Sequence, residues 1–316
     1  MPTAAFIPPP AHDAPLPPPL ETARGTHLLT GIPYAALPGM RPLELDVWLP
    51  PPSKDPAPAV LFLHGGGWRA GSRHLAGPAF RGVTPSPFEQ VARAGIAVAS
   101  ADYRLSGEAT WPAQLHDAKA AVRWLRARAG ELGIDGDRIA AWGESAGGHL
   151  AELLGLTTGD PALEGDIGVA GPSSQVSAVV AWYAPSDVAA MAADTGTDPM
   201  DPDTREARLL GAPPPVVPGV AAQASPITHV SPAAPPFLLL HGAADRLVPC
   251  VQSERLHRTL RKTGRNAELV VYPAADHMWS GSPGAAQQAL QQTISALTRW
   301  LEPTGEAAGR DYSSSP

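Results

Sequence analysis

The sequence lacks the features that define several classes of protein. It has one cysteine, Cys250, among 316 residues, so no disulfide can form within the chain. Charged residues make up only 17% of the chain, and the net charge is −7 at pH 7. A surface that binds nucleic acid needs clustered Lys and Arg, which this balance does not supply. We therefore expect no nucleic-acid partner.

Membrane signals are also missing from the sequence. No stretch reaches the roughly 18 uninterrupted apolar residues that indicate a membrane-spanning helix. The first residues, "MPTAAFIPPPAHDAPLPPPL", have neither the basic start nor the apolar core of a secretory signal. No polybasic segment is present that would bind an anionic membrane surface. These absences lead us to expect no membrane partner and a cytoplasmic location.

Proline, by contrast, is abundant and unevenly spread. The 38 prolines gather near the N-terminus and between Pro199 and Pro236. We expect residues 1–24 to form an extended or disordered arm and residues 305–316 to form a loose tail. Residues 25–304 are long enough to bury the core of a single domain.

Within that domain, short apolar runs alternate with helical patterns. Amphipathic helices are expected over residues 113–133, 251–264 and 285–303, each with apolar residues on one face. The segments typical of strands are "LELDVWLP", "AVLFLHGG", "GIAVASADYR", "RIAAWGES", "VSAVVAWYA", "PFLLLHG" and "AELVVYP". This alternation predicts an α/β fold with a mostly parallel central sheet and helices on both faces. Functional residues in such folds collect beyond the carboxyl ends of the strands.

One such strand end carries the pattern Gly-x-Ser-x-Gly, with Ser145 at its centre. The segment "GESAG" follows the strand "RIAAW" and precedes the helical stretch "AGGHLAELLGL". A nucleophile elbow needs this strand–turn–helix context, and the small residues allow a sharp turn. Because the chain holds 31 glycines, a serine in an ordinary glycine-rich bend is the alternative. The choice depends on whether catalytic partners exist elsewhere.

A second strand end gives a glycine loop. In "LFLHGGGWRAGS", the apolar run ends at His64, which we expect to hold the loop through hydrogen bonds, and three glycines follow. Backbone N–H groups without neighbouring side chains can donate to a substrate oxyanion, together with the N–H of Ala146. No Gly-Lys-Ser/Thr follows, which disfavours a phosphate-binding loop. Neither metal-ligand spacing nor a dinucleotide fingerprint is present, so we expect no metal and no cofactor.

Two later strand ends supply the partners that a catalytic serine requires. Asp245 lies just beyond "PFLLLH", and His277 follows "AELVVYP". A serine hydroxyl needs an imidazole to take its proton, and the imidazole needs a carboxylate to fix its tautomer. Asp276 and Glu254 are alternative acids. A side chain adjacent to His277, as that of Asp276 is, would usually point away from the imidazole, and the strand-end rule favours Asp245. Of the ten histidines, we assign a late strand end to His277 alone.

Together these segments resemble a known family of enzymes. "LELDVWLP", "HGGGWRAGSR", "DYRLSGEATWPAQLHDAKAAVRWLRA", "GIDGDRIAAWGESAGGHLA", "HGAADRLVP" and "YPAADH" are similar to segments of alpha/beta-hydrolase esterases. More narrowly, they resemble the branch that contains hormone-sensitive-lipase-like and feruloyl-esterase-like carboxylesterases. The resemblance covers residues 40–302. It implies the alpha/beta-hydrolase fold.

The resemblance also implies roles for individual residues. Ser145 would be the nucleophile, His277 the base and Asp245 the acid. The oxyanion hole would be formed by the N–H groups of Gly66, Gly67 and Ala146. Trp68, which follows the glycines, would either line the substrate pocket or cover the loop.

The function implied is that of a serine carboxylesterase acting on a small-molecule ester with a short acyl chain. The run of His, glycines and Trp is also similar to kynurenine formamidases, so hydrolysis of an N-formyl amide is an alternative. A non-catalytic binding protein on this fold is a further alternative, although none of the implied catalytic residues is missing. The Pro-rich insertion at about residues 186–231 is too long for an ordinary connection, and we expect it to form a small cap.

Overall fold

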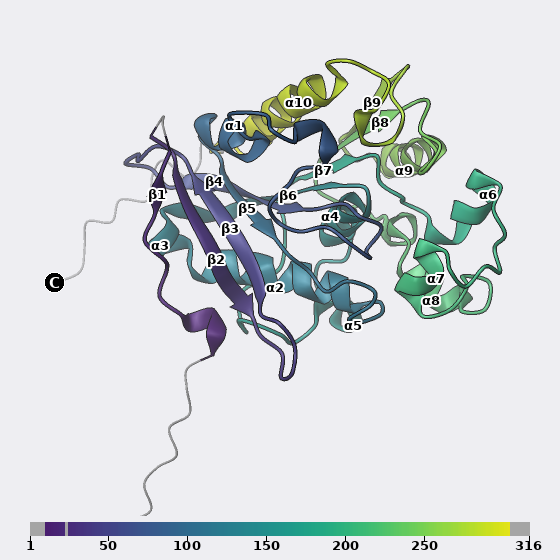
Figure 1. Ribbon diagram of the computed structural model, residues 1–316, viewed down its shortest axis with the longest axis horizontal. Helices are drawn as coiled ribbons and strands as arrows, with labels where there is room; N and C mark the ends of the chain where they lie inside the picture. The colour runs from purple at the N-terminus through teal and green to yellow at the C-terminus, as the bar shows by residue number, and fades with distance from the viewer. Residues whose placement is uncertain (1–9, 23–24, 304–316) are drawn as a thin grey trace, which may run out of the picture.

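The computed structural model describes residues 10–22 and 25–303. The expected tail, residues 305–316, and residues 1–9 and 23–24 of the expected arm lie outside this part of the chain. Within it, a nine-stranded sheet runs through the molecule in the order β1-β2-β3-β5-β4-β6-β7-β8-β9 (Figure 1). The strands are β1 (Leu20–Glu21), β2 (His27–Ala35), β3 (Leu43–Leu49), β4 (Ala57–Leu63), β5 (Ala97–Ala101), β6 (Ile134–Glu144), β7 (Val179–Trp182), β8 (Phe237–Gly242) and β9 (Ala267–Tyr272).

The sheet is mostly parallel, as the sequence predicts. Strands β5, β4, β6, β7, β8 and β9 pair in parallel, whereas β1, β2 and β3 form an antiparallel edge that joins the rest through β3 and β5. The sequence analysis did not anticipate β1 or β2. Strand β2 contains Gly31 and Pro33, and its register with β3 shifts near both residues. These irregularities hide the alternation by which a strand is recognised.

Helices cover both faces of the sheet. Figure 1 shows α1 and α10 together along one face, and α2, α3 and α5 on the other side. The predicted helix over residues 113–133 is interrupted, because α2 ends at Ala127 and a separate turn, α3, follows. The helices are α1 (Pro87–Arg93), α2 (Ala113–Ala127), α3 (Ala129–Leu132), α4 (Ala146–Leu156), α5 (Pro161–Glu164), α6 (Met191–Thr195), α7 (Arg205–Leu210), α8 (Pro218–Gln223), α9 (Val251–Lys262) and α10 (Ala285–Trp300), and the 3₁₀ turns are η1 (Ala11–Asp13), η2 (Pro78–Phe80), η3 (Val188–Ala190), η4 (Pro226–His229) and η5 (His277–Trp279).

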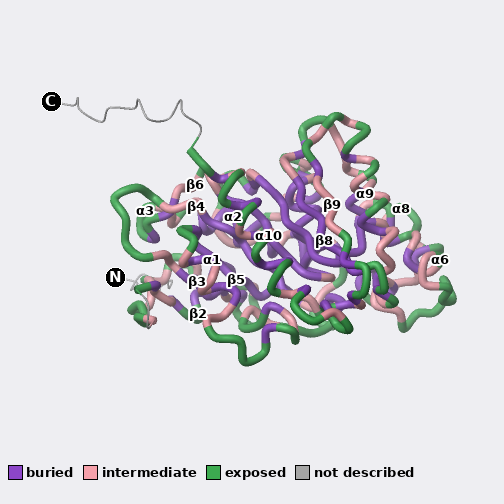
Figure 2. Tube along the Cα trace, turned by 90° about the horizontal axis from the view of Figure 1, so that it is seen from above, coloured by how far each residue is buried: buried purple, intermediate pink, exposed green. Residues whose placement is uncertain are grey.

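The hydrophobic core has two halves, one on each face of the sheet. One half joins the sheet to α2, α4 and α9, and the other joins it to α1 and α10. Figure 2 shows the buried residues concentrated along the strands between these layers. Because the central strands are buried on both faces, their sequences are continuous apolar runs rather than alternating ones.

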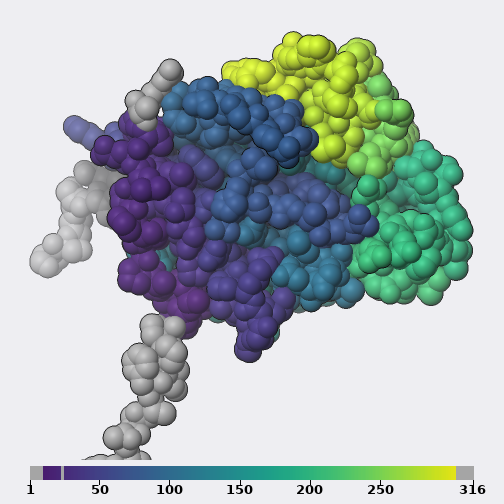
Figure 3. All heavy atoms as spheres, in the orientation of Figure 1, coloured from purple at the N-terminus to yellow at the C-terminus, as the bar shows by residue number. Residues whose placement is uncertain are grey.

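The described part of the N-terminal arm lies against this core. The carbonyl oxygen of His12 accepts hydrogen bonds from Trp124 Nε1, at 3.1 Å, and from Arg128 Nη1, at 3.2 Å. Both donors belong to α2 or to the residue that follows it. At the opposite end of the molecule, residues between β7 and β8 form a block that contains α6, α7 and α8 (Figure 3).

The contact that positions the site most directly is the one between α4 and β4. A Cβ atom built at Gly147 would collide with the carbonyl oxygens of Leu63 and His64. Only glycine allows the first turn of α4 to approach the backbone of β4 so closely. This approach brings the start of α4, directly after Ser145, beside the glycine loop that follows β4.

We predict that Gly147→Ala lowers the free energy of unfolding by about 3 kcal/mol, because neither colliding atom belongs to a movable side chain. Gly130→Ala is the matched control, because open space surrounds that glycine in α3. The control should leave stability unchanged or raise it by up to about 1 kcal/mol. Urea denaturation of both variants measures the difference, and equal stabilities would contradict the close contact.

Candidate active site

Ser145 lies on a strained turn between β6 and α4. Its backbone angles are φ 52° and ψ −119°, which few residues other than glycine adopt. The turn is fixed on both sides: Ser145 N–H donates to the Trp182 carbonyl at 2.8 Å, and the Ser145 carbonyl accepts from His149 N–H at 3.0 Å. Strain held by such contacts keeps the hydroxyl at the end of the turn, where it lines a cavity.

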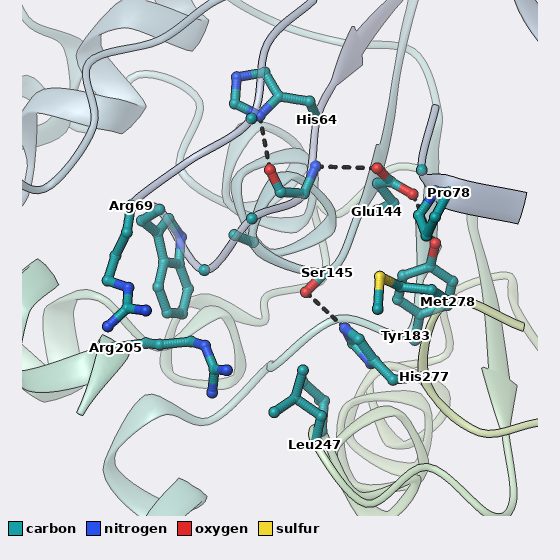
Figure 4. A pocket seen from close by; sticks show the side chains of 18 of the residues that line it. His64, Arg69, Pro78, Glu144, Ser145, Tyr183, Arg205, Leu247, His277 and Met278 are labelled. Carbon is teal, nitrogen blue, oxygen red and sulfur yellow. Dashed lines mark hydrogen bonds between the residues drawn. The ribbon is translucent and has the colours of Figure 1, made fainter. Parts of the chain in front are cut away.

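The structure brings Ser145, His277 and Asp245 together in one chain of hydrogen bonds. His277 Nε2 lies 3.0 Å from Ser145 Oγ, and His277 Nδ1 lies 2.6 Å from Asp245 Oδ2. The three residues follow β6, β9 and β8, which pair in parallel with their neighbours. Figure 4 shows the imidazole of His277 directed at Ser145. The carboxyl ends of the strands thus assemble residues that are far apart in sequence.

The carboxylate of Asp245 is fixed by hydrogen bonds to both of its oxygens. Its Oδ1 accepts the N–H groups of Leu247, at 2.9 Å, and Val248, at 2.8 Å. Burial alone would raise the pKa of Asp245, but the imidazoles of His241 and His277 outweigh burial and hold that pKa well below its usual range. The group is therefore ionised at neutral pH and oriented toward His277 Nδ1.

His241 is a residue of this site that the sequence analysis missed. The statement that His277 alone has a late strand-end position is wrong, because His241 ends the apolar run of β8. Its buried ring lies beside the acid, with Nε2 3.5 Å from Asp245 Oδ2. Nδ1 lies 2.7 Å from Ser253 Oγ, and Nε2 lies 2.8 Å from the Val248 carbonyl. The signal available in the sequence was the position of His241 at the end of the apolar run "PFLLLH".

Among the described residues, neither alternative acid, Asp276 or Glu254, contacts the imidazole of His277. Asp276 binds Arg246, with Oδ2 2.6 Å from Nη2, and it accepts the backbone N–H of His277 at 2.8 Å. No contact joins its carboxylate to the imidazole of His277 among the described residues. Glu254 is exposed on α9. The geometry thus favours Asp245 over both.

The glycine loop and the start of α4 present backbone N–H groups to the same cavity. Gly66, Gly67 and Ala146 all line it. Within residues 10–22 and 25–303, no backbone hydrogen bond uses the N–H of any of the three. Gly66 and Gly67 have φ values of 118° and 61°, a backbone conformation that favours glycine. The loop closes on itself, since the Gly66 carbonyl accepts from Arg69 and Ala70 N–H.

Neighbouring side chains hold this loop in place. His64 Nδ1 lies 2.7 Å from the Gly65 carbonyl, which agrees with the expected role of His64. The imidazole stacks on the ring of Tyr103, with 4.3 Å between centroids, and the Tyr103 hydroxyl donates to the His64 carbonyl. Figure 4 shows His64 turned away from Ser145.

Trp68 connects the loop to α4. Its indole is buried, and Nε1 donates to His149 Nδ1 at 3.2 Å. His149 Nε2 in turn lies 2.6 Å from the Ala224 carbonyl, so Nε2 carries the proton of a neutral imidazole. Burial lowers the pKa of His149 to about 4, in accord with that neutral form. Trp68 also contributes to the lining of the cavity.

Glu144, the residue before the serine, is buried beneath the loop. Its carboxyl group accepts from the Tyr183 hydroxyl at 2.6 Å and from Gly65 N–H at 3.2 Å. Burial raises the pKa of Glu144 to about 7, although both hydrogen bonds oppose the rise. Because the pKa exceeds its ordinary value of 4.5, the protonated form favours folding, and this contribution is lost as the pH rises through about 7.

We predict that Glu144→Gln removes this pH dependence. Between about pH 5 and about pH 8, the free energy of unfolding of the wild type should fall relative to that of the variant by about 2–3 kcal/mol. Urea denaturation at several pH values measures the difference. A constant difference between the two proteins across this range would contradict the raised pKa.

Ser145, His277, Glu144 and the glycine loop line one cavity of about 420 Å³, a size typical of small-molecule sites. Its lining combines the glycine loop, Ser145 and His277 with residues of the block between β7 and β8, among them Arg205 and Glu206. Among the described residues, no group of three or more His, Cys, Asp or Glu could hold a metal ion. Over the same residues, no helix combines the length and apolar character needed to cross a membrane.

Known proteins match this chain over most of its length. Residues 45–260, more than half of the 316, match the BD-FAE family. The chain belongs to the BD-FAE family. Among curated proteins, this BD-FAE chain is 34% identical to the esterase LipC of Mycobacterium tuberculosis over 76% of its own residues. It spans only 58% of the length of LipC.

Solved structures support the same grouping. A truncated carbohydrate esterase from gut microbiota superimposes with a TM-score of 0.76 and 31% identity, covering 87% of this chain and 96% of that one. The propionate-bound thermophilic esterase Est2 of Thermogutta terrifontis gives a TM-score of 0.69 and 29% identity, covering 89% and 97%. These likenesses confirm both the alpha/beta-hydrolase fold and the esterase resemblance.

Proposed function

We propose that this BD-FAE protein is a serine carboxylesterase. The observation that carries the proposal is the hydrogen-bonded chain from Ser145 through His277 to Asp245, which ends in a cavity lined by unengaged backbone N–H groups. Such a constellation activates a serine and stabilises the oxyanion that acyl transfer creates. LipC, the carbohydrate esterase from gut microbiota and Est2 are all described as esterases. These likenesses support ester hydrolysis rather than N-formyl amide hydrolysis.

Each residue has a distinct task in the proposed reaction. Ser145 Oγ attacks the ester carbonyl carbon while His277 Nε2 takes the hydroxyl proton. Asp245 keeps the other imidazole proton on Nδ1 and stabilises the imidazolium that forms. His277 then gives its proton to the leaving alcohol, and an acyl group remains on Ser145. A water molecule, activated by the same imidazole, attacks the acyl group and releases the acid.

The negative charge of each tetrahedral intermediate falls on the former carbonyl oxygen. The N–H groups of Gly66, Gly67 and Ala146 are the proposed donors to that oxygen. Since no backbone group in the described chain competes for them, they are available before substrate binds. Preorganised donors of this kind lower the barrier because they do not reorient during the reaction.

The cavity volume favours small esters with short acyl chains. A space of about 420 Å³ lies near the lower end of the range for small-molecule sites. Est2, which binds propionate in its solved structure, is a relative with a similar fold. We further propose that Trp68, which lines the cavity, helps to shape it. The cytoplasmic location stays a prediction.

The block between β7 and β8 is proposed to act as the small cap. Its residues Arg205 and Glu206 line the cavity together with the glycine loop. Contacts with α9 attach the block to the domain: Asp194 accepts from Gln252 Nε2 at 2.6 Å and from Arg255 Nη2 at 2.9 Å. A cap tied to a core helix limits the size of the pocket that it covers.

We predict that Ser145→Ala lowers kcat for p-nitrophenyl acetate by roughly 10⁵- to 10⁶-fold, because His277 binds no other hydroxyl among the described residues. Hydrolysis of the acetate, butyrate and octanoate esters, with N-formylkynurenine alongside, measures activity and chain-length preference. The short esters should be the better substrates. Equal ester hydrolysis by the variant and the wild type would refute the proposal, and faster hydrolysis of the formamide would assign the enzyme to amide substrates.

We predict that Asp245→Asn lowers kcat by about 10⁴-fold, because an amide cannot stabilise the imidazolium and favours the wrong tautomer. Asp276→Asn is the matched control, since this carboxylate binds Arg246 rather than the ring of His277. Its effect should be smaller by at least about two orders of magnitude. A larger loss of kcat in the Asp276 variant than in the Asp245 variant would show that Asp276 is the catalytic acid.

A further inference from the structure

Three arginines, Arg69, Arg81 and Arg205, line the cavity, and none of them forms an ion pair with a carboxylate within the described residues. Arg69 follows the glycine loop, and Arg205 begins α7. Neither forms an ion pair or a side-chain hydrogen bond within the described residues. Other arginines near the cavity are engaged: Arg73 binds Asp46 and Asp102, at 2.9 and 2.5 Å. Of the three cavity arginines, Arg69 and Arg81 are exposed, and Arg205 is half-buried.

Contacts along its stem position Arg205 toward the reaction centre. A Cβ atom built at Gly67 would collide with the Cδ and Nε atoms of Arg205, so the arginine stem packs directly on the glycine loop. Arg205 is only half-exposed. Arg208, one turn later on the same helix, is exposed and pairs with Asp203 at 2.6 Å. The helix therefore holds one arginine over the loop and leaves the other at the surface.

Among the described residues, no carboxyl group in the cavity forms an ion pair with Arg69 or Arg205. Glu144 is hydrogen-bonded to Tyr183 and to the backbone of Gly65. Glu206 lines the cavity but forms no ion pair within 10–22 and 25–303. Burial raises the pKa of Glu206, and the positive charges of Arg205 and Arg69 oppose that rise. The arginines thus remain available to an incoming anion.

The side of the cavity on which the arginines lie indicates which half of a substrate they contact. Figure 4 shows Arg69 and Arg205 on the side of Ser145 away from His277. In the proposed reaction the leaving alcohol takes its proton from His277, so the alcohol must face the imidazole. The acyl chain then extends to the other side, toward the two guanidinium groups.

From this arrangement we infer that Arg205 and Arg69 form a subsite for a carboxylate on the acyl half of the substrate. The preferred substrates are then hemiesters of dicarboxylic acids, a specificity that rests on the proposed esterase function. Guanidinium groups bind carboxylates through paired, charge-assisted hydrogen bonds. At Arg205, whose side chain is half-buried, such a bond discriminates against a neutral analogue.

Mono-4-nitrophenyl succinate, glutarate and adipate test the subsite, each against its own neutral methyl ester. Spontaneous hydrolysis is subtracted by using Ser145→Ala. For the chain length that fits, wild-type kcat/KM should be at least about tenfold higher for the acid than for its methyl ester, mainly through KM. This preference should weaken as ionic strength rises.

Arg205→Gln should lower that preference by about 10- to 100-fold, and Arg205→Lys should restore part of it. The matched control is Arg208→Gln, which should keep both the activity and the preference of the wild type. Thermal melting of each variant verifies that it is folded. An acid-to-methyl-ester ratio near one in the wild type, or a ratio unchanged in Arg205→Gln, would overturn the subsite.

A final pair of substrates tests the assignment to the acyl half. In 4-acetoxybenzoate and its methyl ester the carboxylate sits on the leaving group. Preference for the acid in this pair, without preference among the hemiesters, would also overturn the inference. Failure of the subsite leaves the esterase proposal intact if neutral esters are hydrolysed by the wild type and not by Ser145→Ala.

Discussion

The close approach of α4 to β4 is the constraint on which the site depends. Gly147 allows the two backbones to meet without side chains between them. As a result, the N–H of Ala146 at the start of α4 and the glycine loop after β4 face the same cavity. The strained conformation of Ser145 is the local consequence, since the chain must turn sharply to connect β6 to a helix packed so tightly. The proposed nucleophile and oxyanion hole follow from that juxtaposition.

Around this contact, buried polar side chains fix the parts that must not move. His64 and Tyr103 hold one side of the glycine loop, and Trp68 ties the other side to His149 on α4. Glu144 links the loop to Tyr183 from below. These groups are satisfied inside the protein, so they rigidify the loop without taking up its N–H donors. The proposed oxyanion hole thus owes its shape to these surrounding side chains as well as to its own glycines.

The sequence allowed the central part of this arrangement to be predicted, because its signals are local or follow the strand-end rule. The turn around Ser145 is encoded by small residues, and Asp245 and His277 each follow a recognisable apolar run. Other parts depend on packing between distant segments. The unpaired position of Arg205 depends on how the block between β7 and β8 folds over Gly67, which no periodicity indicates. The register shifts of β2 hide the alternation of apolar and polar residues by which a strand is recognised. The contact between His241 and Asp245 depends on how the loop after β8 folds back on the strand.

The central claim is that Ser145 is a nucleophile activated by its neighbours. The most direct measurement is covalent labelling with a dialkyl phosphate ester such as paraoxon, followed by peptide mapping in a mass spectrometer. One phosphoryl group per chain on the peptide that contains Ser145, formed in step with the loss of ester hydrolysis, is the result predicted. Labelling of another residue, or full ester hydrolysis after Ser145 has been modified, would contradict the account.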